Sequence, residues 1–105
     1  MNYTVSWSPE AKRTFKNTVQ YLEENWSRRA AIHFIDRVYE VVNLISKHPK
    51  IFVHFPEYEA HRCVVVKQVS LFYRIKENQT ELLTFWDNRM DPKKLMLSAY
   101  EQKEI

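Results

Sequence analysis

The sequence predicts a single α+β domain, 1–105, in which an antiparallel two-helix hairpin packs on an antiparallel sheet of three to four strands. Two stretches in the N-terminal half repeat apolar residues at spacings of three and four, which is typical of helices with one buried face. A later stretch is rich in Val, Phe, Tyr and Leu and divides into short runs, which is typical of strands. With 105 residues, 45% of them hydrophobic, the chain is long enough to bury one core.

The N-terminal half is expected to form a strand followed by two helices. Residues Tyr3 to Trp7 alternate large apolar and small polar side chains, the period of a half-buried strand. Ser8 precedes Pro9, so Ser8 is expected to cap a helix with proline at its first position, and Ser27 to cap the second helix. The expected apolar stripes are Ala11, Phe15, Val19, Leu22 and Trp26 in the first helix and Ala31, Phe34, Ile35, Val38, Val41, Val42 and Ile45 in the second.

The C-terminal half is expected to form a three-stranded meander and a short terminal helix. Residues Ile51 to Glu59 fit no regular period and are expected to form an ordered loop. In the last turn of the meander, Asn78 is the residue that best tolerates a positive φ in a chain without glycine. Asp91 and Pro92 then have the order of a helix cap and a first helical position. The expected strands are His61–Lys67, Val69–Lys76 and Thr80–Asp87.

The composition excludes several classes of function. The chain contains no glycine, whereas P-loops, dinucleotide fingerprints and EF-hand loops all depend on glycine conformations. Its one cysteine, Cys63, cannot form an internal disulfide and matches no zinc pattern, so we expect an interior thiol, no metal and no cofactor. No signal peptide is evident, and no segment approaches the roughly 20 apolar residues that span a bilayer. We therefore expect a cytoplasmic protein that does not bind membranes.

Several short motifs follow one another in a specific order. They are Trp7 before Ser8-Pro9-Glu10-Ala11, Tyr21 to Ser27 leading into Ala30-Ala31, Ile45 to Pro49, Arg62, Leu71-Phe72-Tyr73-Arg74-Ile75, Leu82 to Arg89, and Asp91-Pro92. In this order, over almost its whole length, the chain resembles the RelE/ParE family of bacterial toxins from type II toxin-antitoxin modules. One departure is the loop after the helical hairpin, where family members often have glycines and this chain has Phe52 to Tyr58.

The resemblance implies a growth-inhibiting protein that is neutralised by a cognate antitoxin wrapped around it. RelE-like members are ribosome-dependent endoribonucleases that cut mRNA without a metal, whereas ParE-like members inhibit DNA gyrase by binding to it. The resemblance leaves both mechanisms open. A non-toxic interaction domain is a third alternative.

Three arginines are the candidates for catalysis if the chain is a ribonuclease: Arg62, Arg74 and Arg89. Metal-free RNA cleavage needs cations that stabilise a phosphorane, and the planar arginine fork matches phosphate oxygens. The resemblance places Arg62 and Arg89 where ribonuclease members carry cationic residues. Arg74 follows the expected core residue Tyr73, so it should lie on the other side of the sheet with Phe72. The alternative is that all three are solvated edge charges or antitoxin contacts.

The candidates for proton transfer are His54, His61, Tyr73 and Tyr100. His61 adjoins Arg62 but faces the other side of a regular strand, so a solvated histidine is the simpler interpretation. Tyr73 is expected in the core. The resemblance allows a ribonuclease tyrosine near the position of Tyr100, in the terminal tail. No general acid and base pair emerges from the sequence.

The charge favours a binding function over RNA cleavage. The chain has 16 basic and 13 acidic residues, a formal net charge of +3. Residues 61–95 hold seven basic and four acidic side chains, so this charge lies in the expected sheet and terminal helix. A protein that grips ribosomal RNA should be more basic, and we therefore favour ParE-like binding to gyrase over RelE-like cleavage on the ribosome. The residues expected to contact a partner are Trp86, Asp87, Lys93 and Lys94.

Overall fold

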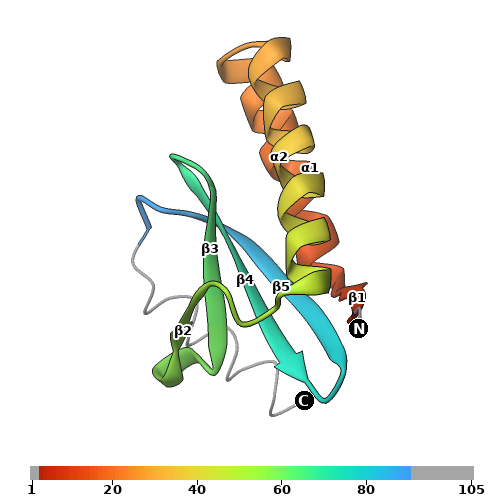
Figure 1. Ribbon diagram of the computed structural model, residues 1–105. Helices are drawn as coiled ribbons and strands as arrows, with labels where there is room; N and C mark the ends of the chain where they lie inside the picture. Colours follow the sequence, from red (N-terminus) through yellow and green to blue (C-terminus); the bar gives the residue numbers. More distant parts are fainter. Residues whose placement is uncertain (1–2, 91–105) are drawn as a thin grey trace.

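The computed structural model describes residues 3–90 and contains, within them, two helices packed beside a sheet (Figure 1). The order confirms the predicted strand, two helices and meander, with each predicted strand end within one residue of the observed one. The helix predicted from Asp91 onward lies outside the described residues. The elements are β1 (Thr4–Trp7), α1 (Pro9–Asn25), α2 (Arg28–Lys47), β2 (Val53–Phe55), the 3₁₀ helix η1 (Pro56–Tyr58), β3 (Ala60–Val66), β4 (Val69–Lys76) and β5 (Gln79–Asp87).

The strands form one mixed sheet with the order β1-β5-β4-β3-β2. β1 pairs with β5 in parallel, and the other neighbours are antiparallel. The prediction of a purely antiparallel sheet of three to four strands is therefore wrong in two respects: β1 adds a parallel edge, and β2 adds a fifth strand. β2 lies within Ile51 to Glu59, which was expected to be a loop, because three residues are too few to show a period.

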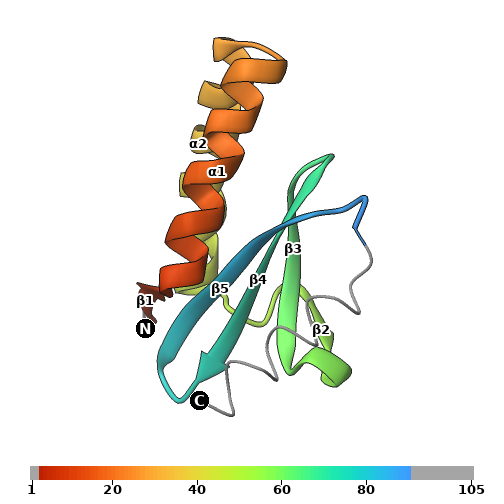
Figure 2. The same cartoon turned by 180° about the vertical axis from the view of Figure 1, so that it is seen from behind.

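The two helices form an antiparallel hairpin on one side of the sheet, beside β5 (Figures 1 and 2). As predicted, Ser8 accepts a hydrogen bond from the Ala11 amide at the start of α1, and Ser27 accepts one from Ala30 at the start of α2. Trp26 differs from the prediction, since it is 60% exposed. Helix α1 ends at Asn25, so the helical spacing no longer directs the next side chain toward the sheet.

Aromatic rings join the helices to the sheet in the core. Phe15 of α1 stacks on Phe34 of α2 with 5.7 Å between ring centroids. The ring centroid of Phe85 in β5 lies 5.6 Å from that of Phe15 and 5.9 Å from that of Phe34. The ring centroid of Trp7 in β1 lies 5.4 Å from that of Phe15. Burial of rings of this size stabilises the hairpin on β5 more than any polar contact could.

The side of the sheet that faces away from the helices is called here the open face. Near β2, Tyr58 of η1 packs on this face against Phe72 and Phe55, with centroid distances of 6.2 and 6.0 Å. Phe72 is consequently buried although it points away from the helices. By strand alternation and register, the open face of the three long strands includes Ala60, Arg62, Val64, Ser70, Phe72, Arg74, Lys76, Gln79, Glu81, Thr84 and Trp86.

A bulge in β5 determines which of its side chains reach the open face. Phe72 pairs with Thr84 and Tyr73 pairs with Leu82, so Leu83 is an extra residue in β5. The Leu83 carbonyl accepts a hydrogen bond from the Ser8 hydroxyl at 2.9 Å. One serine therefore both caps α1 and fixes the bulge.

The β4–β5 turn differs from its prediction in one detail. Glu77, with φ 59°, takes the left-handed conformation that was expected of Asn78. The loop between Lys76 and Gln79 has only two residues, and in such hairpins the first central position requires positive φ. The turn geometry therefore overrides the residue preference.

Replacing Ser8 tests this double role. Ser8→Ala removes the helix cap and the hydrogen bond to the bulge, and should lower the free energy of unfolding by about 2 kcal/mol. Ser27→Ala is the matched control, because it removes a cap alone, and should cost about 1 kcal/mol. Urea unfolding of the two variants measures both values. Equal losses would show that the bond to Leu83 contributes nothing.

Candidate functional site

The open face carries two of the three predicted arginines. Arg62 on β3 lies opposite Phe72 on β4, and Arg74 lies two residues further along β4, so both are on this face. Arg89 follows β5 and pairs instead with Asp87, which lies opposite the core residue Val69. The structure therefore brings Arg62 and Arg74 to one surface and leaves Arg89 apart from them.

Arg62 is held by neutral side chains. Its Nε donates to the Ser70 hydroxyl at 3.0 Å, and its Nη2 donates to Asn88 Oδ1 at 3.0 Å. The Ser70 hydroxyl donates to the same Asn88 oxygen at 2.6 Å. Asn88 is itself fixed by two hydrogen bonds to the backbone. Its side-chain amide donates to the Lys67 carbonyl at 3.0 Å, and its backbone N–H donates to the Gln68 carbonyl at 2.8 Å. This group, Arg62 with Ser70 and Asn88, is called the Arg62 clamp.

Neither Ser70 nor Asn88 was among the predicted site residues. Both belong to small polar types that are common in turns and strands, and nothing in their local sequence marks them. Only the register between β3 and β4, together with the position of the bulge in β5, brings them to Arg62. A regular alternation count from Arg62 through the two-residue turn would have placed Ser70 on the opposite face, because β3 has a register shift between Val64 and Val66.

Arg74 has a weaker anchor. Its Nε donates to the Glu59 carbonyl at 3.4 Å, which is at the limit of a hydrogen bond. Glu81 lies directly opposite Arg74 on β5, so this end of the open face combines a cation with a carboxylate.

Asp87 and Arg89 form an ion pair at the end of β5. The Arg89 guanidinium donates to both carboxylate oxygens, with Nη2 to Oδ2 at 2.7 Å and Nε to Oδ1 at 3.0 Å. These bonds lower the pKa of the Asp87 carboxyl. The same bonds raise the pKa of Arg89, and a hydrogen bond between Arg89 and Tyr21 of α1 raises it further. Arg89 is therefore already paired and is less available to a ligand than Arg62.

The remaining predicted partner-binding residues lie near this strand end or beyond it. Trp86 is half-buried on the open face, and its indole N–H donates to the Met90 carbonyl at 3.4 Å. Lys93, Lys94 and the proton-transfer candidate Tyr100 lie outside the described residues.

The other proton-transfer candidates lie on the opposite side of the sheet from Arg62. His61 pairs with Tyr73 across β3 and β4 and stacks on its ring, with 5.2 Å between centroids. His54 of β2 lies 4.8 Å from His61. Tyr73 is fully buried and donates to the Pro49 carbonyl at 2.6 Å, and burial raises the pKa of its phenol. These positions confirm that His61 points away from Arg62 and that Tyr73 belongs to the core.

The partly buried His61 and the buried Cys63 on that side are both shifted toward their neutral forms. Burial lowers the pKa of His61, and the nearby His54 and Lys50 lower it further. The His61 Nδ1 atom is buried without a hydrogen-bond partner among residues 3–90. Cys63 is 2% exposed, as predicted for an interior thiol, and burial raises its pKa to about 11.

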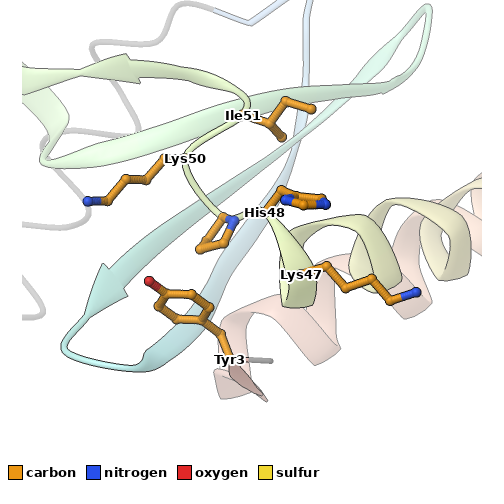
Figure 3. A pocket seen from close by; sticks show the side chains of 6 residues that line it. Tyr3, Lys47, His48, Lys50 and Ile51 are labelled. Atoms are coloured by element: carbon orange, nitrogen blue, oxygen red, sulfur yellow. The ribbon is translucent and has the colours of Figure 1, made fainter. Parts of the chain in front are cut away.

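A pocket of about 520 Å³ lies at the end of α2, lined by Tyr3, Pro49, Ile51 and three basic side chains (Figure 3). Those of Lys47 and Lys50 extend in opposite directions rather than toward a common point (Figure 3). The pocket therefore lacks the convergent polar groups that bind a small ligand.

Within residues 3–90, no three His, Cys, Asp or Glu side chains are grouped so that they could hold a metal ion. Neither helix in that part of the chain is long and apolar enough to cross a membrane.

His61 should make the stability of the fold depend on pH. Its pKa is lower in the folded than in the unfolded chain, so the unfolded chain binds more protons and stability falls as the pH decreases from about 7 to 5. His61→Gln should reduce this slope, whereas His33→Gln, an exposed change on α2, should preserve it. Urea unfolding across this pH range measures the slope. An unchanged slope in His61→Gln would contradict the assignment.

Solved structures with the same fold include toxins of toxin-antitoxin systems. The chromosomal ParDE system from P. aeruginosa matches with a TM-score of 0.67 at 11% identity, covering 81% of this chain and 95% of that chain. The YoeB dimer from Staphylococcus aureus matches with a TM-score of 0.56 at 12% identity, covering 80% of this chain and 94% of that chain. The YoeB-YefM complex from the same organism matches with a TM-score of 0.53 at 11% identity, covering 81% of this chain and 95% of that chain. Identities this low show the fold alone.

No curated protein matches the chain by sequence. A family model, in contrast, matches residues 5–92, which include both helices and every strand from β2 to β5. Its description is the ParE toxin of the type II toxin-antitoxin system, parDE. This chain therefore belongs to the ParE toxin family of type II toxin-antitoxin systems.

Proposed function

We propose that this ParE-family toxin arrests growth by binding to DNA gyrase and is neutralised by a cognate antitoxin. The family supports the toxin role. The antitoxin is supported by the similar solved structures, which include a ParDE system and a YoeB-YefM complex. The gyrase target extends the family resemblance to this chain.

One observation favours binding over catalysis: the open face around Arg62 has no histidine among the described residues. His54 and His61 lie on the other side of the sheet, and Tyr73 uses its hydroxyl inside the core. RNA cleavage would need a proton acceptor and a proton donor near the cations. A surface with a fixed guanidinium and no such pair suits recognition of a partner.

RelE-like cleavage of ribosome-bound mRNA is the second candidate. The observation in its favour is that Arg62 and Arg74 share the open face with Glu81, which lies opposite Arg74. On β5, Glu81 is separated from β3 and Arg62 by the whole width of β4. A carboxylate at that position would have to act as the base without a neighbouring acid.

Expression in a bacterial host and two assays with purified protein separate these candidates. The wild-type chain should stop growth and block DNA supercoiling by gyrase, while primer extension shows no new cuts in ribosome-bound mRNA. Arg62→Gln should weaken gyrase inhibition about tenfold, because the charge on the open face is lost. Arg13→Gln removes an exposed arginine of α1 and is the matched control that should inhibit normally.

If ribosome-bound mRNA is cut while gyrase supercoils DNA normally, the gyrase proposal is wrong and the chain is a ribonuclease. Full growth during expression, with the chain shown to be folded, would contradict both.

A further inference from the structure

The Arg62 clamp holds a positive charge that is not neutralised by any carboxylate among residues 3–90. Three other arginines in this part of the chain form ion pairs, Arg13 with Glu10, Arg37 with Glu40 and Arg89 with Asp87. Arg62 instead bonds to a hydroxyl and an amide oxygen. These bonds fix the orientation of the guanidinium and leave its charge intact.

The clamp also leaves hydrogen-bonding capacity unused. A guanidinium has five N–H donors, and within residues 3–90 Arg62 uses two of them, one on Nε and one on Nη2. Ser70 is fully buried and Asn88 is held by the backbone at Lys67 and Gln68, so the guanidinium cannot turn freely. A donor set that is oriented in advance loses less entropy when a ligand binds.

The surface on both sides of the clamp is apolar. Val53 of β2 lies directly opposite Arg62, and Val64 lies two residues after Arg62 on β3, so both valines share its face of the sheet. Val53 is 65% and Val64 53% exposed. A half-buried cation therefore adjoins two exposed aliphatic side chains, Val53 across the strand pair and Val64 along β3.

We propose that the Arg62 clamp binds a carboxylate side chain, Asp or Glu, of an extended protein segment. Aliphatic residues two positions away from that carboxylate share its side of the segment and contact Val53 and Val64. The carboxylate accepts charge-assisted hydrogen bonds from the free N–H groups of Arg62, which are stronger than bonds between neutral groups. This inference rests on the proposed function in one respect, namely that the toxin acts on and is controlled by protein partners. It specifies the chemistry that such a partner presents to the open face.

A protein segment fits this surface better than a nucleic acid. A phosphate backbone is contacted by several cations in succession, whereas Val53 and Val64 occupy the positions beside Arg62. Aliphatic side chains gain free energy from contact with other apolar groups, which a sugar-phosphate chain does not offer. The formal net charge of +3 is also small for nucleic-acid binding.

Two blocked five-residue peptides test the proposal with the intact chain. One has Glu at its central position and valine two positions before and after it, and the other has Gln in place of Glu. Titration monitored by NMR should shift the resonances of Val53, Val64 and the Arg62 side chain with the Glu peptide, and the Gln peptide should bind about tenfold more weakly. A short single-stranded RNA, added as a competitor, should not displace the Glu peptide.

A charge placed inside the clamp tests whether the unneutralised guanidinium is the cause. Asn88→Asp keeps an oxygen that accepts from Arg62 and Ser70 and supplies an internal counter-charge, but it loses the amide donor to the Lys67 carbonyl. The backbone N–H of residue 88 still donates to the Gln68 carbonyl, and binding of the Glu peptide should fall about tenfold. Asn78→Asp makes the same change in net charge in the exposed β4–β5 turn and is the matched control. It should leave the affinity unchanged. Amide spectra of both variants verify that they are folded.

Three results would overturn the proposal. They are equal binding of the Glu and Gln peptides, no shift at Val53, Val64 or Arg62 at millimolar peptide, and equal weakening by Asn88→Asp and Asn78→Asp. Displacement by RNA would assign the clamp to a phosphate ligand instead. The peptide assay contains no gyrase and no cell, so its failure is distinct from a failure to arrest growth or to inhibit gyrase.

Discussion

The bulge at Leu83, whose carbonyl accepts a hydrogen bond from Ser8, is the feature on which the arrangement of the open face depends. In a strand, one extra residue reverses the side to which every later side chain points. Because Leu83 is that residue, Phe85 enters the aromatic core and Thr84 and Trp86 turn away from the helices. The bulge also determines where the chain leaves β5, and thus places Asn88 beside Arg62. The start of α1 is therefore bonded to the bulge that orients a site on the other side of the sheet.

The sequence was sufficient to predict both helices and the four longer strands, but neither the short elements between α2 and β3 nor the way the elements meet. Both helix starts could be predicted because Ser8 and Ser27 are good caps next to clear apolar periods, and the long strands because their composition is distinctive. β2 was missed because three residues show no period. The clamp could not be predicted, since Asn88 reaches Arg62 only through the bulge at Leu83, and a bulge leaves no signal in a chain of alternating residues.

Two arginines of this chain illustrate how partners determine what a charged side chain can do. Arg89 is bonded to both oxygens of Asp87, so a ligand would have to compete with a carboxylate that is already in place. Arg62 is oriented just as firmly, but by Ser70 and Asn88, which carry no charge. A fixed orientation, with no carboxylate among residues 3–90 to neutralise the charge, suits recognition of an acidic group. It accords with a family whose members are toxins controlled by protein partners, and with an open face on which the described residues include no histidine.

The central claim of this account is that Ser70 and Asn88 hold the Arg62 guanidinium in a fixed position in the free protein. The most direct measurement is the hydrogen exchange rate of the Arg62 Nε–H in the side-chain NMR spectrum, compared with that of Arg28, which is exposed on α2. The account predicts that the Arg62 proton exchanges much more slowly than the Arg28 proton, and that Ser70→Ala abolishes the difference. Equal exchange rates for the two arginines in the wild-type chain would contradict it.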